Sequence, residues 1–433
     1  MAKLELMPHQ KEALEKLKNY DSCAIGYDLG LGKTFLGSEQ LKHYDNITNL
    51  VVVQCSKVKD WIDHFEKYYS DDYQIYNLTK VNDYVKFIGS KEKRIGVINY
   101  DIVFRRGELL DLRDMTLMLD ESSMIQHPNT KRTSFIMRLH TKNVILLSGT
   151  FTNGKLENLY TQAFLTGYKI SKTTFEKLYT VKELQQVKRF NPNTYKLETK
   201  YFNQIVGYQN EDKLFRKLHD LGWIFKKTEE VLNLPDKVFI TKEIPLSNDY
   251  KKFKKNRVLL EPQLIGDTPT KRFIYYRQIA SVYSKDKLQA LEDILNSTNE
   301  RVIVFYNFVG ECEELTKLCK KLNKPISYMN GSEKDMSAYG SENDSVTLIQ
   351  YQSGSFGLNL QKCNQTVYYS PPLSCEQFEQ SKARTRRIGQ DKACFYWLLV
   401  MKDSIEVKIY ETLEKRSDFT NDLFRSMEAN KEI

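Results

Sequence analysis

Short apolar runs alternate with amphipathic stretches through the first 165 residues of the chain. Four runs are apolar almost throughout, as expected for strands buried on both faces: residues 49–55 (NLVVVQC), 94–100 (RIGVINY), 117–121 (LMLDE) and 143–149 (NVILLSG). The stretch KVKDWIDHFEKYY, which lies between two of these runs, places its apolar residues at helical spacing. This alternation predicts a parallel sheet covered by helices.

The same pattern returns near the end of the chain, at residues 301–308, 346–352, 365–371 and 393–400. Residues from 166 to about 290 lack it; this part is rich in Lys and Tyr and mostly helical in period. We therefore expect an α/β fold with two lobes in tandem and a largely helical, basic insertion between them. The expected divisions are a first lobe at 1–168, the insertion with its linker at 169–285, and a second lobe at 286–433.

Composition places the chain among globular proteins, with 41% apolar and 28% charged residues in 433. No apolar run approaches the roughly 18 residues of a membrane span, so no membrane association is expected. Seven scattered cysteines without a CxxC pair favour reduced thiols in a cytoplasm, with no structural zinc.

The net charge of +9 is modest, but its distribution points to the middle of the chain. Residues 169–200 hold eight Lys/Arg against three Glu, and residues 251–257 hold five further basic residues. A solvated helix face explains either cluster alone. Because both lie between the predicted lobes, a groove for a polyanion is the alternative.

The segment GYDLGLGKTF (26–35) predicts a phosphate-binding loop between a strand and a helix. Glycines allow backbone N–H groups at a helix start to approach an anion, while a lysine reaches the outer phosphates. A hydroxyl at the next position holds Mg²⁺. The candidate nucleotide-binding residues here are Gly30, Leu31, Gly32, Lys33 and Thr34. A glycine turn before an ordinary helix is the alternative, since a tyrosine replaces the leading glycine of the usual spacing.

A second strand, LMLDESS (117–123), ends in Asp120 and Glu121. Nucleotide hydrolysis needs carboxylates at such a position, one for the Mg²⁺ shell and one to activate water. We therefore expect Asp120 to hold the metal and Glu121 to orient water. The alternative is that both residues cap the following helix.

Taken together, the motifs resemble those of the SWI/SNF-related DNA-dependent ATPase family of superfamily II helicases. In order along the chain they are LMPHQKEALEKL, DLGLGKT, VVVQCSKVKDWIDHFEK, DESS, LLSGTFTNGKLENLY, VIVFYNF, GSFGLNL and QSKARTRRIGQ. The resemblance spans roughly residues 4 to 400 and implies two RecA-like lobes. The chain departs from the family pattern at Tyr27, Phe151 and Ser355, among other positions, which affects the expected DNA contacts more than the ATPase residues.

The resemblance also implies roles for individual residues. Gln10 is placed to read adenine, and Gly357 belongs to the nucleotide-binding set. Arg384 and Arg387 occupy the positions of arginine fingers from the second lobe, with a solvated basic face as the alternative. Four further residues are candidates for contacts with DNA phosphates: Ser56, Lys57, Gly331 and Ser332.

The expected function is an ATP-dependent motor that uses Mg²⁺ and moves along double-stranded DNA, in repair, replication or recombination. Single-stranded DNA is a further candidate partner, a monomer is favoured, and composition suggests a bacterial or phage source. The alternatives are a strand-separating DNA or RNA helicase and a non-catalytic nucleotide-gated clamp. The absence of a hairpin signal in the middle segment argues against a strand-separating wedge, although RFNPNTYK, with Phe190 and Tyr195, could form a small one.

Overall fold

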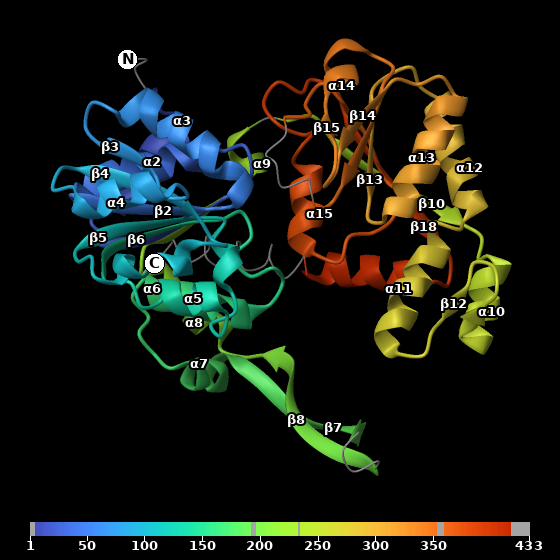
Figure 1. Ribbon diagram of the computed structural model, residues 1–433, viewed down its shortest axis with the longest axis horizontal. Helices are drawn as coiled ribbons and strands as arrows, with labels where there is room; N and C mark the ends of the chain where they lie inside the picture. The colour runs from blue at the N-terminus through green and yellow to red at the C-terminus, as the bar shows by residue number, and fades with distance from the viewer. Residues whose placement is uncertain (1–4, 192–195, 233, 353–358, 417–433) are drawn as a thin grey trace. The chain divides into compact units, whose positions relative to one another are not determined.

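The computed structural model describes residues 5–191, 196–232, 234–352 and 359–416 (Figure 1). These residues form two compact units, the first ending at Thr228 and the second beginning at Glu229. The division therefore falls inside the segment that we expected to form the insertion. None of the helices in the described part of the chain is long and apolar enough to cross a membrane.

The first unit is built on a seven-stranded, entirely parallel sheet with the order β3-β4-β2-β5-β6-β1-β9. Its strands are β1 (Ser22–Tyr27), β2 (Thr48–Val53), β3 (Gln74–Asn77), β4 (Arg94–Asn99), β5 (Met115–Asp120), β6 (Thr141–Leu147) and β9 (Trp223–Lys226). The central strands β2, β4 and β5 are buried along almost their whole length, which explains their uniformly apolar sequences. Strand β9 comes from the middle segment and extends this sheet beyond β1.

Helices cover both faces of this sheet. They are α1 (Pro8–Leu17), α2 (Lys33–Tyr44), α3 (Val58–Tyr69), α4 (Val81–Gly89), α5 (Lys131–Ile136), α6 (Tyr160–Leu165), α7 (Lys172–Tyr179) and α8 (Glu211–His219). Helices α4 to α8 contribute to one apolar core. In Figure 1, α5, α6 and α8 lie on one side of the sheet and α2 and α3 on the other.

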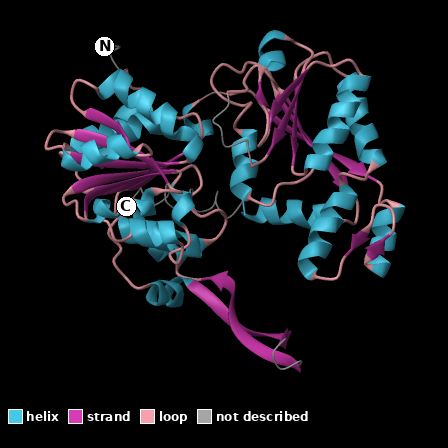
Figure 2. Ribbon diagram, viewed as in Figure 1, coloured by secondary structure: helices cyan, strands magenta, loops and turns pink. Residues whose placement is uncertain are grey.

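The second unit holds another seven-stranded sheet, with the order β10-β18-β17-β13-β16-β14-β15 (Figure 2). Its strands are β10 (Lys237–Ile244), β13 (Val302–Tyr306), β14 (Ile326–Met329), β15 (Lys334–Asp335), β16 (Val346–Gln350), β17 (Gln365–Tyr368) and β18 (Cys394–Met401). Only the short edge strand β15 pairs antiparallel within the described part of this sheet.

The helices of this unit include α10 (Asn248–Asn256), α11 (Pro269–Ala280), α12 (Lys285–Asn296), α13 (Val309–Lys321), α14 (Ser337–Ser341) and α15 (Cys375–Lys382). A short α9 (Thr228–Val231) precedes β10, strands β11 (Val258–Leu259) and β12 (Leu264–Ile265) form a small ladder, and residues 405–416 are helical. The expectation of two α/β lobes in tandem, each built on a mainly parallel sheet, is confirmed.

The middle segment contains helices, as expected, but also a long antiparallel hairpin that was not predicted from the sequence. Strand β7 (Thr180–Asn191) pairs with β8 (Lys196–Tyr208) along its whole length. The expectation that this segment holds no hairpin was wrong. Its two strands are mostly polar on both faces, so neither shows the apolar alternation by which a half-buried strand is recognised.

Candidate nucleotide and nucleic-acid sites

The predicted phosphate loop connects the end of β1 at Tyr27 to the start of α2 at Lys33, so the expected order of strand, loop and helix is present. Gly30 and Gly32 have φ angles of +90° and +74°, in the left-handed region that favours glycine. At Gly32 a Cβ atom would lie 2.2 Å from Nε2 of Gln10, so a larger residue would displace that side chain. Helix α2, which has 12 residues, begins directly after the loop. The N–H groups of its first turn point toward the loop, as in sites that bind an anion at a helix N-terminus.

Gln10 holds this loop from helix α1. Its Nε2 donates to the carbonyl oxygens of Leu31 and Gly32, each at 3.3 Å, and its Oε1 accepts from the Met7 N–H at 2.9 Å. His9 Nε2 lies 3.1 Å from the same Leu31 oxygen. Gln10 is thus beside the phosphate loop, while its predicted contact with adenine stays a prediction.

Lys33 is almost entirely buried at the start of α2. Its Nζ donates to the carbonyl oxygen of Tyr27 at 2.5 Å. Gly149, in the loop after β6, lies beside it, since a Cβ built on Gly149 would be 3.7 Å from this Nζ. The neighbouring Thr34 is the second residue of the helix, and its carbonyl accepts from Ser38 Oγ at 2.8 Å.

Asp120 ends strand β5 at the same edge of the sheet as the phosphate loop. The register places both Ile25 of β1 and Asp120 of β5 opposite Leu147 of the intervening strand β6. Trp61 Nε1 donates to Asp120 Oδ2 at 2.8 Å. Burial raises the pKa of Asp120 above its usual value, while the Trp61 hydrogen bond and the charge of Lys33 act in the opposite direction.

Glu121 follows with a φ of +51°, which is uncommon for a residue other than glycine. The next residue, Ser122, donates to Gln162 Oε1 at 2.8 Å, and Gln162 Nε2 donates to the Phe151 carbonyl at 2.9 Å. These bonds connect the strand-end carboxylates to the segment after β6. The left-handed backbone of Glu121 is a strained conformation of the kind that is common at functional sites.

Trp61 and Gln162 were not identified from the sequence. Trp61 contributes to the apolar stripe of α3 and reads as an ordinary core residue there. Gln162 lies inside α6 and carries no local signal of its contacts.

The donor set fits a nucleotide-bound magnesium ion. Thr34 supplies a hydroxyl oxygen and Asp120 a carboxylate oxygen, which are the hard ligands that Mg²⁺ prefers. The described residues contain no group of three or more His, Cys, Asp or Glu arranged to bind a metal alone. Mg²⁺ usually takes one or two carboxylates together with substrate phosphates, so these residues suit it.

In the second unit, Arg384 and Arg387 follow helix α15. The Arg384 carbonyl accepts from the Leu360 N–H at 3.1 Å, and Arg387 Nη1 donates to Asn359 Oδ1. Burial lowers the pKa of Arg387, which remains a cation at neutral pH. The two arginines thus lie beside Asn359 and Leu360, the last two residues of the GSFGLNL motif, whose Gly357 lies outside the described residues.

Arg386, between them, has a different environment. Its Nε donates to the Pro235 carbonyl at 2.7 Å and its Nη1 to Glu229 Oε1 at 2.8 Å. It therefore ties the loop after α15 to the segment before β10. The role of Arg384 and Arg387 as arginine fingers stays a prediction.

Ser56 and Lys57 lie in the short 3₁₀ turn just after strand β2. Lys57 Nζ pairs with Asp60 at 2.8 Å, and its charge opposes the rise in the pKa of Asp120 that burial causes. Lys57 is consequently near the carboxylate end of the nucleotide site. Its contact with a DNA phosphate stays a prediction.

Gly331 and Ser332 lie in the turn between β14 and β15. Asn330 Oδ1 accepts from Ser332 N and Oγ and from Glu333 N, which fixes the turn. The turn borders a cavity of about 550 Å³ near the ends of β13 and β16. Both residues line this cavity, and their contact with a DNA phosphate stays a prediction.

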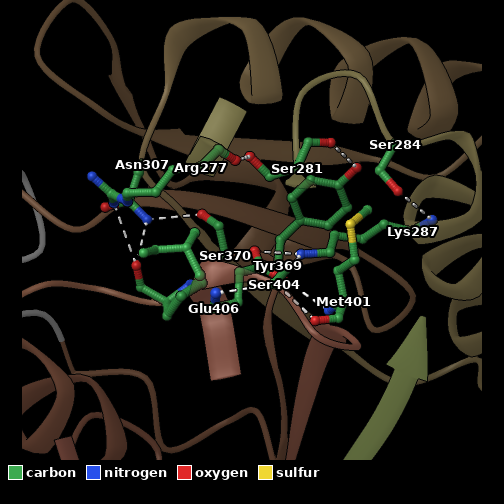
Figure 3. Close-up of polar contacts among 12 residues, drawn as sticks. Arg277, Ser281, Ser284, Lys287, Asn307, Tyr369, Ser370, Met401, Ser404 and Glu406 are labelled. Carbon is green, nitrogen blue, oxygen red and sulfur yellow. Dashed lines mark hydrogen bonds and ion pairs between the residues drawn. The ribbon is translucent and has the colours of Figure 1, made fainter. Parts of the chain in front are cut away.

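A buried ion pair lies in the core of the second unit (Figure 3). Lys287 Nζ of α12 is 2.6 and 2.7 Å from the two carboxylate oxygens of Glu406, and both side chains are excluded from solvent. Glu406 Oε2 also accepts from the Met401 N–H at the end of β18. Burial raises the pKa of Glu406, and Lys287 opposes that shift.

A second part of this polar network fixes the ends of β13 and β17. Glu311 Oε2 accepts from Asn307 N at 2.7 Å, from Phe308 N at 3.0 Å and from Ser370 Oγ at 3.1 Å. The Arg277 guanidinium lies 5.0 Å from the centre of the Phe308 ring. Sequence reasoning did not identify Glu311 or Arg277, since neither belongs to a motif with a recognisable spacing.

Comparison with known proteins shows two domain matches, which overlap at residues 286–306. Residues 9–306 match the SNF2-related domain, and residues 286–389 match the helicase conserved C-terminal domain. A solved structure, the Sulfolobus solfataricus SWI2/SNF2 ATPase core in complex with dsDNA, is 20% identical, with a TM-score of 0.45, and the match covers 97% of this chain and 93% of that one.

Several curated proteins are similar over most of the chain. The putative ATP-dependent helicase/translocase YwqA of Bacillus subtilis is 24% identical over 74% of this chain and 36% of its own length. The DNA repair and recombination protein RAD54B of Gallus gallus is 23% identical over 86% of this chain and 47% of its own length. The ISWI chromatin-remodeling complex ATPase ISW1 of Saccharomyces cerevisiae is 23% identical over 94% of this chain and 39% of its own length. The chain spans less than half the length of each of these relatives. The domain match over most of its residues nevertheless establishes that the chain belongs to the SNF2-related family.

Proposed function

We propose that this protein is a DNA-dependent ATPase that couples ATP hydrolysis to translocation along double-stranded DNA. The observation that carries the proposal is the meeting of Lys33 and Asp120 at one edge of the first sheet, beside a loop that requires glycine. Family membership supports the reaction class, and the relatives' names connect such proteins with helicase, repair and remodelling functions. Repair, replication or recombination is the proposed setting.

The residues of the first unit would divide the work of hydrolysis. Lys33 would exchange its contact with the Tyr27 carbonyl for the outer phosphates, because a phosphate oxygen is a stronger acceptor for an ammonium group. Thr34 and Asp120 would hold Mg²⁺, which neutralises charge on the phosphates. Glu121 would orient the attacking water.

Arg384 and Arg387 would complete the site from the second unit by stabilising the charge of the transition state. Arginine fingers contribute about 10³–10⁵ in rate. A site divided in this way would hydrolyse ATP only when the units close, which would couple each turnover to a step along DNA. Contacts with the strand would go to phosphates through Ser56, Lys57, Gly331 and Ser332, because a motor must pass over any sequence.

A strand-separating helicase is the second candidate, and the β7–β8 hairpin specifically favours it. Separation of base pairs commonly needs a wedge at the fork, and a projecting hairpin can provide one. A non-catalytic clamp is less well supported, because such a protein has no need to retain Lys33, Asp120 and Glu121 together.

The proposal is tested by the steady-state ATPase rate without nucleic acid and with single-stranded DNA, double-stranded DNA or RNA. All measurements use one salt concentration, because phosphate-driven binding varies steeply with salt. Double-stranded DNA is expected to stimulate hydrolysis most. Equal rates under all four conditions would contradict a DNA-dependent ATPase, and strongest stimulation by RNA would reassign the partner.

A further inference from the structure

The β7–β8 hairpin forms an extended two-stranded ribbon, which projects from its own unit beside α7 (Figure 1). Its strands contain 12 and 13 residues, which corresponds to a length of about 40 Å. A two-stranded ribbon has little stability of its own in water unless it packs on another element or carries a hydrophobic face. A projecting ribbon of this length is therefore an unusual feature, and the side chains that it exposes indicate which kind of partner it binds.

The described part of the ribbon exposes several large apolar side chains. Leu184 is 68% exposed, Tyr201 65% and Phe202 47%. Tyr201 and Phe202 are consecutive, so they point to opposite faces of the ribbon. Each face consequently offers one aromatic ring to a partner.

Most residues around these rings are polar or basic, and Leu184 lies on the same face of the ribbon as Tyr201. Residues 180–208 hold five Lys/Arg against two Glu, a net charge of +3. The register places Phe202 opposite Gln185, and Lys200 lies two residues before Phe202 on the same face. An interface with another protein normally has an apolar centre that is depleted of charge, whereas Lys182, Glu183 and Lys200 lie among the exposed apolar residues of this ribbon.

Aromatic rings interspersed with basic residues are suited to single-stranded nucleic acid. Bases stack on the rings and the cations follow the phosphates. In a duplex each base is already stacked on its neighbours, so the rings can be used only where bases are unpaired. We propose that the β7–β8 ribbon is an accessory binding arm that receives unpaired bases of a DNA junction on Tyr201 and Phe202. This inference rests on the proposed function, because it assumes that DNA is the partner.

The test compares the affinities of the full chain for three fluorescent DNAs of equal length, without ATP and at one salt concentration. They are a blunt duplex, a forked duplex with two non-complementary arms, and a single strand. Base stacking contributes about 1–3 kcal/mol per base, so the Tyr201→Ser/Phe202→Ser variant should bind the fork and the single strand about tenfold more weakly. Its affinity for the blunt duplex should change less than twofold.

Two further variants complete the test. Tyr283→Ser removes a tyrosine that is 41% exposed in the other unit and should leave all three affinities unchanged. Tyr201→Trp/Phe202→Trp retains the rings and should retain the affinity for the fork. Equal thermal unfolding midpoints will show that the variants are folded.

Equal loss of affinity for blunt and forked DNA would overturn the proposal, because the ribbon would then contact duplex generally. Unchanged affinity for all three DNAs would overturn it as well, and sedimentation would then show whether the same substitutions abolish self-association. A wild-type ATPase that no DNA stimulates would contradict the proposed function instead. That result is distinguishable, because the binding comparison is made without ATP.

Discussion

The two units each bury one lysine side chain among the described residues, Lys33 in the first and Lys287 in the second, and the two have different environments. Lys287 is held between both carboxylate oxygens of Glu406, so its charge is matched inside the core. Lys33 donates to a neutral backbone carbonyl beside a glycine loop and lies near Asp120. The difference indicates that a buried charge whose partner is built into the core serves the fold, whereas a buried charge at a loop can serve a ligand.

The largest effect is expected at the first lysine. Lys33→Ala should reduce kcat/KM for ATP by at least about a thousandfold, because a cation aimed at the transferring phosphate is lost. The free energy of unfolding should change much less than in a variant that breaks the Lys287–Glu406 pair, because Asp120 retains the Trp61 hydrogen bond when the Lys33 charge is lost. Steady-state ATPase assays and urea denaturation measure the two quantities. Near-normal turnover in this variant would show that Lys33 does not act in ATP hydrolysis.

The second lysine should show the opposite behaviour. Lys287→Met leaves Glu406 buried without its cation, which should lower the free energy of unfolding by about 3–5 kcal/mol. The double variant Lys287→Met/Glu406→Leu replaces the pair by apolar residues of similar size and should recover most of this loss. Urea denaturation of both variants measures the effect. If the double variant is as unstable as the single one, the ion pair does not account for the loss.

The third test separates two neighbouring arginines. Arg387→Ala should reduce DNA-stimulated hydrolysis by at least about a hundredfold while leaving DNA affinity nearly unchanged, as expected for an arginine finger. Arg386→Ala is the matched control: it removes bonds to Pro235 and Glu229 and should lower stability rather than the rate per folded molecule. Loss of DNA binding by Arg387→Ala with a normal rate per bound complex would identify Arg387 as a phosphate contact.

The smallest expected effect concerns the pKa of Asp120. The Trp61 N–H stabilises the ionised carboxylate, so Trp61→Phe should raise the pKa of Asp120 further above its usual value. Because the ionised form would hold Mg²⁺, activity should fall as pH decreases through this pKa. The acid limb of the kcat/KM profile should therefore move to higher pH in the variant. An unmoved acid limb would show that another group controls it.

The features found from the sequence are local ones. The buried parallel strands are continuous apolar runs, and the phosphate loop and the pair Asp120–Glu121 each lie within a few residues. Local spacing therefore predicted both lobes and brought Lys33 and Asp120 to one candidate site.

The features that the sequence did not reveal depend on distant residues or on exposure. Lys287 and Glu406 are 119 residues apart, and each alone reads as a surface charge on an amphipathic helix. The β7–β8 ribbon is polar on both faces, so its strands have no apolar period. Trp61 resembles an ordinary core residue in the sequence because it belongs to the apolar stripe of α3. Its hydrogen-bond partner Asp120 is 59 residues away along the chain, so no local pattern reveals the contact.

The central claim is that ATP hydrolysis moves this protein along duplex DNA, and displacement of a third strand from a triplex tests it most directly. The wild-type protein with ATP should displace the third strand while the two strands of the duplex remain paired, and Lys33→Ala should displace nothing. A forked duplex under the same salt conditions serves as the comparison substrate. Efficient separation of the fork would promote the helicase alternative. Failure to displace the third strand, in a preparation whose ATPase is stimulated by duplex DNA, would contradict translocation itself.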